Sequence, residues 1–147
     1  MSLVRLLYAS RMAKGVKPDG LLHILDASRK NNEKLGVTGA LCYSSTGFLQ
    51  ALEGSPAAVN ELFRRIVKDD RNEQVTLLAY HTIPRRRFPD WSMACFRSDE
   101  IDATILGKYS TSRTFDPMTM GSAQAFGFLV QVAAERRRFL RRQADGA

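Results

Sequence analysis

Metal ligands and thiols are scarce in this sequence. It has two cysteines and two histidines in 147 residues. Cys42 and Cys95 lie far apart with no CxxC spacing, and His23 and His81 stand alone, so no set of metal ligands can be read from their spacing. A free cysteine behaves as a small hydrophobe, and we expect both cysteines to be core or strand residues. The pattern favours neither a metalloenzyme nor a thiol-dependent enzyme.

Long apolar segments are missing as well. No apolar run approaches the ~20 residues that a membrane span needs. The N-terminal stretch "MSLVRLLYAS" enters a strand-like pattern and lacks the apolar segment and cleavage site of a secretory signal. The apolar fraction of 44% and the charged fraction of 25% are those of a soluble globular protein. The sequence therefore predicts a cytoplasmic protein with one main domain and a short appendage.

Positive charge is gathered in two short clusters. The three arginines at 85–87 and the five arginines within 135–143 together exceed the net charge of +7, so the rest of the chain is close to neutral. Clustered arginines on a loop and a terminal helix are most often solvated faces. A nucleic-acid-binding module that uses Arg136, Arg137 and Arg138 stays open as an alternative, and its binding would depend steeply on salt.

The hydrophobic pattern predicts seven elements in the order β-α-β-β-α-β-β. The strands cover 3–10, 36–43, 47–54, 74–83 and 91–96, and the first helix covers 18–32. The second helix starts at Pro56 with Ser55 as its N-cap and has one apolar stripe at 59, 62, 63, 66 and 67. This order is the split βαβ arrangement of ferredoxin-like folds, an α+β architecture with two helices on one face of an antiparallel-rich sheet.

Residues 98–147 change character and predict a C-terminal helical extension of the 1–97 domain. The segments "DEIDATILGKY" and "SAQAFGFLVQVAAERRRFLRRQ" have helical patterns, and the Thr, Ser, Pro and Gly between them indicate a connector. The last helix is apolar in its first half and basic in its second. We expect its apolar half to pack on the open sheet face or on a second copy of the chain, which would make a homo-oligomer.

Gln50 interrupts an otherwise apolar strand. Strand alternation turns Gln50 to the same side as Phe48 and Leu52, so its amide is aimed into the core. A buried amide without partners costs roughly 1–3 kcal/mol. Either the fold or a bound ligand must therefore satisfy this side chain.

Each predicted helix carries an isoleucine next to polar side chains. The residues on these two faces are Ile24, Ser28, Asn31 and Asn32 on the first helix and Arg65, Ile66 and Asp69 on the second. In the simpler interpretation, the two asparagines cap the first helix, and Arg65 with Asp69 is a solvated i,i+4 pair. In the other, aliphatic walls and amides form a slot for a flat heteroaromatic ring, closed by Tyr8 and Gln50.

Five segments of the sequence form a recognisable series. They are "LLYAS", "ILDASRKNNEKLGVTGALCY", "GFLQALEG", "VKDDRNEQV" and "FPDWSM". Their order and spacing resemble those of the BLUF domain, the family of blue-light sensors that use FAD. Any one of these motifs is weak, but five in register are specific. The sequence therefore resembles the BLUF family over about residues 3–97.

The resemblance implies a noncovalently bound flavin, either FAD or, alternatively, FMN or riboflavin. Its ring would lie between the two helices, sandwiched by Ile24 and Ile66. Asn31 and Asn32 would bind the pyrimidine edge, with Asn32 reaching C4=O and N3–H. Contacts to the ring edge and to the ribityl and phosphate chain would come from Ser28, Arg65 and Asp69.

The resemblance also implies a light-driven switch. Tyr8 and Gln50 would form a hydrogen-bonded pair, with Gln50 against the flavin N5 and C4=O side. A phenol can pass an electron and a proton to an excited flavin, and an amide can exchange its donor and acceptor ends at little change in shape. A red-shifted signalling state is the expected result. Trp91 and Met93 would relay the change to residues 98–147.

Two departures from the family pattern concern the turn after the second helix and the segment after the methionine. Many relatives have "RH" where this chain has Arg71-Asn72, so a histidine contact near the flavin tail is absent. "WSMAC" also replaces a common form that contains glycine. The first departure concerns the phosphate contacts, and the second concerns the lifetime or coupling of the signal.

The sequence thus predicts a small stand-alone BLUF photoreceptor that is not an enzyme and signals through an unidentified partner protein or through its assembly state. One rival is an acylphosphatase-like enzyme on the same scaffold, for which Arg11 in "SRMAKGVKPDG" is a faint match to an anion-binding loop. The other rival is the nucleic-acid-binding module described above.

Overall fold

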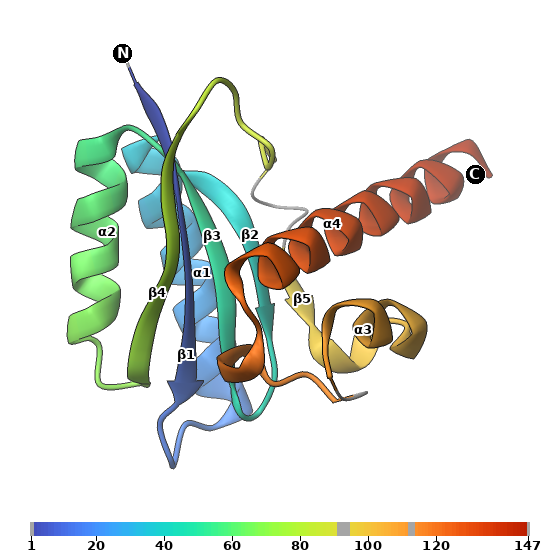
Figure 1. The fold of residues 1–147 in the computed structure, drawn as a ribbon, viewed down its shortest axis with the longest axis horizontal. Helices are drawn as coiled ribbons and strands as arrows, with labels where there is room; N and C mark the ends of the chain where they lie inside the picture. Colours follow the sequence, from blue (N-terminus) through green and yellow to red (C-terminus); the bar gives the residue numbers. More distant parts are fainter. Residues whose placement is uncertain (1, 91–94, 112–113, 147) are drawn as a thin grey trace.

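The computed structural model describes residues 2–90, 95–111 and 114–146 (Figure 1). Its strands are β1 (Leu3–Met12), β2 (Thr38–Tyr43), β3 (Gly47–Gly54), β4 (Asn72–Ile83) and β5 (Cys95–Arg97). Its α-helices are α1 (Pro18–Leu35), α2 (Pro56–Lys68), α3 (Ala103–Tyr109) and α4 (Ser122–Asp145), and two 3-10 turns are η2 (Ser98–Glu100) and η3 (Pro117–Thr119).

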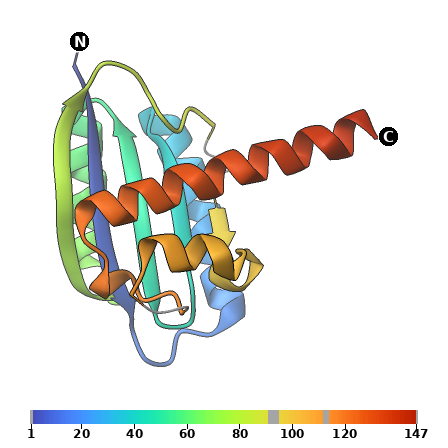
Figure 2. The ribbon, with the colours of Figure 1, turned by 45° about the vertical axis from the view of Figure 1, so that its right-hand side comes forward.

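The strands form one five-stranded sheet in the order β4-β1-β3-β2-β5. The pairs β1–β3, β1–β4 and β2–β3 are antiparallel, and β5 lies parallel to β2. Helices α1 and α2 cover one face, and α4 runs across the other (Figures 1 and 2). The predicted α+β, ferredoxin-like fold with a C-terminal helical extension is confirmed.

The first half of α4 covers the sheet face opposite α1 and α2. Its buried residues are Ala125, Phe128, Leu129, Val132 and Ala133, which pack with side chains of β1, β2 and β3. The sequence left two partners open for this apolar half, the chain's own sheet or a second copy of the chain, and the structure shows it on the sheet. The apolar half of α4 is therefore no longer a reason to expect a homo-oligomer. The second half extends beyond the sheet (Figure 2) and leaves Phe139 53% exposed.

Helix ends follow from local chemistry. Ser55 accepts a hydrogen bond from the Ala58 backbone N–H at 3.2 Å and caps α2, as predicted. Helix α1 runs three residues further than predicted and stops at Gly36, whose φ of 69° suits a glycine C-cap. Val67, the last position of the predicted apolar stripe of α2, lies in the last turn and is half-exposed.

The segment after β5 differs from its prediction. Residues 99–109 are not one helix, because the Asp102 side chain accepts from the Thr104 backbone N–H at 2.8 Å and starts α3 there. The residues before it form the separate turn η2. The predicted strand 91–96 appears as the three residues of β5, and its first four residues lie outside the described ones. Cys42 is a buried strand residue, as predicted.

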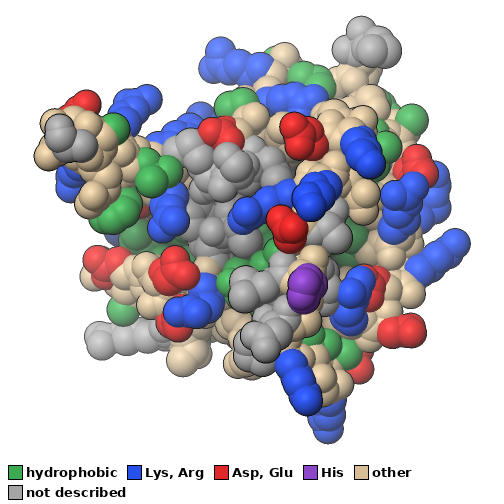
Figure 3. Space-filling model, turned by 180° about the vertical axis from the view of Figure 1, so that it is seen from behind, with side chains coloured by type: hydrophobic (Ala, Val, Ile, Leu, Met, Phe, Trp, Pro, Cys, Tyr) green, Lys and Arg blue, Asp and Glu red, His purple; other side chains and the backbone are tan. Residues whose placement is uncertain are grey.

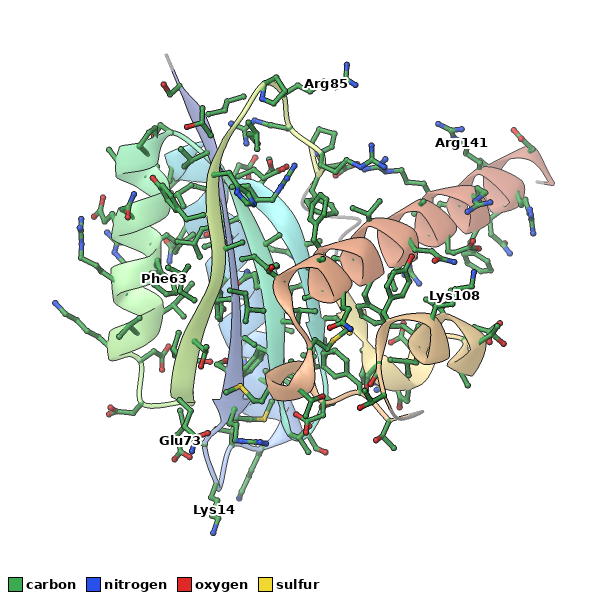
Figure 4. All side chains as sticks on the ribbon, in the orientation of Figure 1. Lys14, Phe63, Glu73, Arg85, Lys108 and Arg141 are labelled. Atoms are coloured by element: carbon green, nitrogen blue, oxygen red, sulfur yellow. The ribbon has the colours of Figure 1, made fainter. Side chains whose placement is uncertain are left out.

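The two arginine clusters have different surroundings. In the loop after β4, Arg86 donates to the Glu53 and Gly36 carbonyls and to Thr38 Oγ1 at 2.7–2.9 Å, so the expectation of a purely solvated cluster is wrong there. On α4, Arg141 points away from the rest of the chain (Figure 4). On the face behind the view of Figure 1, basic side chains are spread among acidic ones (Figure 3).

Two further features of the chain concern glycine and membrane spans. Gly47 lies so close to β1 that a Cβ atom there would be 2.2 Å from the Ser10 carbonyl oxygen. A side chain at this position would therefore force β3 away from β1. Among the described residues, no helix is long and apolar enough to cross a membrane.

Candidate functional site

Tyr8 and Gln50 lie side by side on neighbouring strands. The register of β1 and β3 pairs them directly, and they are 3% and 6% exposed. The Tyr8 hydroxyl donates a hydrogen bond to Gln50 Oε1. Burial of the phenol, and to a lesser degree the negative charge of Asp69, raises the pKa of Tyr8 well above its ordinary value. The pair is therefore a neutral phenol bonded to the acceptor end of an amide.

A pocket opens beside this pair, between α1, α2 and the sheet. Its lining is Tyr8, Leu41, Phe48, Gln50 and Asn72 from the strands, Leu25, Ser28, Arg29 and Asn32 from α1, and Leu62, Ile66, Asp69 and Arg71 from α2 and the turn after it. Phe63 of α2 points toward the sheet (Figure 4), and its ring centroid lies 5.7 Å from that of Tyr8. Apolar walls with a few convergent polar groups are typical of a site for an organic cofactor.

Two polar atoms in the pocket wall are buried without a hydrogen-bond partner. They are Asn32 Oδ1 and Arg29 Nε, and Asn32 as a whole is only 1% exposed. An unpaired buried polar group costs about 1–3 kcal/mol, so two of them in one pocket indicate a ligand that supplies a donor and an acceptor. A heteroaromatic ring with N–H and C=O groups on one edge fits this requirement.

The course of α1 explains why Asn32 faces the pocket. Because the helix continues to Leu35, Asn32 lies within it rather than at its cap, and the backbone carbonyl of Asn32 accepts from the Val37 N–H at 2.9 Å. Residues 25, 28, 29 and 32 share the face turned toward the sheet. The simpler interpretation of the two asparagines as C-cap residues is therefore wrong.

Asn31 and Asn32 do not lie in the same part of the site. Asn31 is exposed and lines a second, outer pocket together with His23 and Arg65. The residues that line both pockets are Ser28, Leu62, Ile66, Asp69 and Arg71. The two pockets are therefore neighbours along the gap between α1 and α2, with Asn32 at the inner one and Asn31 at the outer one.

The turn after α2 holds a close ion pair. Arg71 donates to the two oxygens of Asp69 at 2.8 Å and 2.6 Å through its guanidinium, and its backbone N–H donates at 3.0 Å. The hydrogen bond from the Arg71 side chain holds the pKa of Asp69 below its ordinary value, and the same bond raises the pKa of Arg71. Arg71 thereby brings a guanidinium to both pockets.

Arg65 has a different partner from the one predicted. It donates to Glu61 at 2.8 Å, one turn earlier on α2. The predicted i,i+4 pair between Arg65 and Asp69 is wrong, because Asp69 is the C-cap of α2 and its backbone has already left the helix. Arg65 stays exposed at the outer pocket.

Asn72 joins the sheet to the end of α2. Its Oδ1 accepts from Ser10 Oγ at 3.2 Å, and its Nδ2 donates to the Ile66 carbonyl at 3.4 Å. Asn72, Arg71 and Arg29 are pocket residues that were not among the predicted contacts. Leu25, Arg29 and Asn32 have the i, i+4, i+7 spacing of one helix face, and this sequence signal would have identified Arg29 as a pocket residue.

Three predicted residues cannot be placed in the site. The side chain of Ile24, whose backbone belongs to α1, and all of Trp91 and Met93 lie outside the described residues. The other predicted contacts, Tyr8 and Gln50 included, line one or both of the two pockets.

Comparison with curated proteins finds relatives among light-regulated cyclases. The photoactivated adenylate cyclase subunit beta of Euglena gracilis is 32% identical over 124 residues, which are 80% of this chain and 14% of that protein. Subunit alpha of the same organism is 31% identical over 123 residues, 79% of this chain and 12% of that protein. The chain thus spans only a small part of the curated relatives it matches.

Solved structures give a likeness over most of the chain. The dark-state structure of BlrB, a BLUF protein, is 33% identical with a TM-score of 0.75, and the match covers 91% of this chain and 97% of BlrB. BlsA in its photo-activated state is 29% identical with a TM-score of 0.76, covering 89% and 94% of the two chains. A bacterial light-regulated adenylyl cyclase is 27% identical with a TM-score of 0.63, and the match covers 95% of this chain and 36% of the cyclase.

The family model described as "Sensors of blue-light using FAD" matches residues 3–94. This range contains β1, α1, β2, β3, α2 and β4, and it includes every described residue that lines the two pockets. The chain belongs to the BLUF family.

Proposed function

We propose that this chain is a blue-light photoreceptor that binds a flavin without a covalent bond. The observation that carries the proposal is the buried Tyr8–Gln50 pair at the wall of a pocket that also holds the unpaired atoms Asn32 Oδ1 and Arg29 Nε. A flavin has N3–H and C=O groups on one ring edge, so it can pair with both atoms. The membership of a flavin-using family supports the same ligand.

In this proposal the inner pocket would hold the flavin ring, with Asn32 at its pyrimidine edge. Ile66 from α2 and Ile24 from α1 would flank the ring, and Asn31 would approach from the outer pocket. Ser28, Arg65 and Asp69 would hold the ring edge, ribityl chain and phosphate. Support comes from the arrangement of the two pockets, because the outer one offers an exposed guanidinium where an anionic tail would emerge. FAD is the proposed flavin, and FMN or riboflavin fits the same ring site.

When bound, the flavin would supply blue-light absorption and an excited state that takes one electron from Tyr8 and later returns it. The Tyr8 hydroxyl would pass its proton along the existing hydrogen bond to Gln50 as the electron leaves, and Tyr8 would regain a proton when the electron returns, so that no net oxidation remains. Gln50 then turns or tautomerises, so that it presents its other end to the flavin. Burial keeps the Tyr8 proton in place in the dark, because the pKa of Tyr8 is raised. The result is a red-shifted signalling state.

The signal leaves the flavin-binding part, residues 1–97, toward the helical part, residues 98–147. Trp91 and Met93 take part in the relay in this proposal. The exposed second half of α4, with Phe139 and Leu140, offers a surface to a downstream partner protein or to a second copy of the chain. These 147 residues act as a sensor without a catalytic activity of their own.

The two rival functions have weaker support. Arg11 lies in β1, opposite Gly47 on β3, rather than in the loop where an acyl phosphate would be held. In the arginine clusters, Arg86 is bonded to protein carbonyls, and Arg138 is paired with Glu135 at 2.7 Å. Neither observation favours an acylphosphatase-like enzyme or a nucleic-acid-binding module.

The test is the visible absorption spectrum before and after blue light. We expect a flavin spectrum that shifts red reversibly in the wild type and in the control Tyr80→Phe, because Tyr80 is an exposed residue of β4 whose hydroxyl accepts from Asn60 and which lines neither pocket. The shift should be absent in Tyr8→Phe and Gln50→Leu. A flavin spectrum that ignores light or bleaches would refute the switch. A colourless protein that cannot be reconstituted with FAD, FMN or riboflavin would refute the proposed function altogether.

A further inference from the structure

Glu53 is a fully buried carboxylate, 0% exposed, that the proposed photochemistry does not use. It lies three residues after Gln50 on β3, so strand alternation turns it to the opposite face of the sheet, the face covered by α4. Its partner in the β1–β3 register is Arg5, three residues before Tyr8. The same two strands therefore carry Tyr8 with Gln50 on one face and Arg5 with Glu53 on the other, about 10 Å apart along the strands.

The Glu53 carboxylate collects hydrogen bonds from two parts of the chain. Arg5 Nε donates to it at 2.9 Å. The backbone N–H of Arg87 donates at 2.9 and 3.1 Å to its two oxygens, and the N–H of Phe88 donates at 2.7 Å. Both backbone donors belong to the segment after β4, which we call the 84–90 segment. Hydrogen bonds to an ionised carboxylate are stronger than those between neutral groups, so Glu53 fixes this segment to β3.

The same cluster reaches α4. The Arg5 guanidinium lies over the ring of Phe126 at 4.3 Å from its centroid. The Phe126 ring also meets Phe88 edge to face, with ring centroids 6.2 Å apart at an interplanar angle of 81°. Arg5 and Glu53 thus connect β1, β3, the 84–90 segment and the buried half of α4 in one contact network.

We propose that Arg5 and Glu53 are positioning residues that transmit a change at Tyr8 and Gln50 through the sheet to the 84–90 segment and α4. The proposal rests on the photoreceptor function proposed above. A rearranged Gln50 alters how β3 lies against β1, and interiors are packed too densely for Glu53 to shift while its donors stay in place. The donors move with it, and two of them belong to the 84–90 segment.

The test compares amide hydrogen exchange in the dark and under blue light, in the full flavin-loaded chain. The main variant is Glu53→Gln, which keeps the shape of the side chain but turns an NH2 group toward N–H donors. The matched control is Glu135→Gln, an exposed glutamate on α4. We expect the wild type and the control to show a light-minus-dark difference in exchange at residues 84–90 and 122–134. Glu53→Gln should keep the red shift of the flavin and lose at least four-fifths of that difference.

A merely structural role for Glu53 predicts another result. Loss of a structural contact would raise exchange in the dark and in the light alike and leave the difference between them intact, which would overturn the proposal. Should Glu53→Gln fail to fold, Phe126→Leu replaces it, because this variant leaves every Glu53 hydrogen bond in place. It should lose the light-minus-dark difference at residues 122–134 and keep that at 84–90, and retention at 122–134 would overturn the proposal.

The photoreceptor function and the role of Arg5 and Glu53 are refuted by different results. A wild type without a red shift refutes the photoreceptor function and this inference with it. A wild type with a red shift, together with a Glu53→Gln variant whose light-minus-dark difference is unchanged, refutes only the role of Arg5 and Glu53.

Discussion

Replacement of Asn32 by leucine should make the flavin-free protein more stable and the flavin-bound complex weaker. Asn32 Oδ1 is buried in the pocket wall without a partner. Leucine has the same number and branching of side-chain heavy atoms as asparagine but no polar atom, so the substitution removes the unpaired oxygen without opening a cavity. A substitution that raises the stability of the flavin-free protein but lowers its affinity for flavin identifies a side chain whose role is to bind the ligand.

The unpaired oxygen sets the size of both effects. A buried polar group without a partner costs about 1–3 kcal/mol, so Asn32→Leu should raise the free energy of unfolding of the flavin-free protein by about that amount. In the proposed complex, the same change would leave the flavin N–H that pairs with Asn32 without a partner. The dissociation constant should rise about 5- to 140-fold, since 1.4 kcal/mol is a factor of ten.

Urea unfolding of the flavin-free protein and quenching of flavin fluorescence on binding measure the two quantities. Asn31→Leu is the matched control for stability, because Asn31 is the exposed neighbour and surface substitutions usually change stability by less than about 0.5 kcal/mol. If Asn32→Leu lowers the stability of the flavin-free protein by more than about 1 kcal/mol, the oxygen has a structural partner and the reasoning fails.

Other predictions concern pH and the packing of the strands and helices. The raised pKa of Tyr8 favours the neutral phenol in the folded state, so its contribution to stability is complete below about pH 10 and is lost as pH rises from there toward the folded-state pKa. Unfolding free energies measured above pH 10 should therefore fall more steeply in the wild type than in Tyr8→Phe, and equal slopes would contradict this. Gly47→Ala should cost about 1–3 kcal/mol through the clash with the Ser10 carbonyl, whereas an unchanged urea midpoint would show that β1 and β3 can separate freely. Ser55→Ala should lower stability by about 1 kcal/mol through loss of the α2 cap, with a change in thermal midpoint as the measure. Gln74→Gly should raise stability by about 1 kcal/mol, because Gln74 has a φ of 52°, and a lower thermal midpoint would speak against strain there.

The main elements and the central pair of the site follow from the sequence. Two-residue alternation placed Gln50 on the face of Phe48 and Leu52, and the pairing of Gln50 with Tyr8 came from the family resemblance. The Ser-Pro start of α2 was equally readable, since Ser55 caps the helix as predicted. The strand alternation and the helix start depend on local spacing, which a single sequence contains, whereas the Tyr8–Gln50 pair joins residues 42 apart.

The remaining features depend on where an element ends and on how the elements pack together. The partner of Asp69 is Arg71 rather than Arg65 because α2 ends at Lys68, one residue before Asp69. The separation of Asn31 from Asn32 depends on how α1 is turned against the sheet. The burial of Glu53 depends on a loop more than 30 residues away in the sequence. No local pattern encodes the last two of these features.

Helix α4 has the properties of a lever. It contains 24 residues, and its last buried residue, Ala133, lies halfway along it. The second half, residues 134–145, is about 18 Å long at 1.5 Å per residue, and in its first turn Arg136 lies 3.9 Å from Glu100. A tilt of the anchored half by about 10° would therefore displace the tip by about 3 Å at that length. A strand shift too small to disturb the packing of the sheet would in this way become a movement large enough for another molecule to detect.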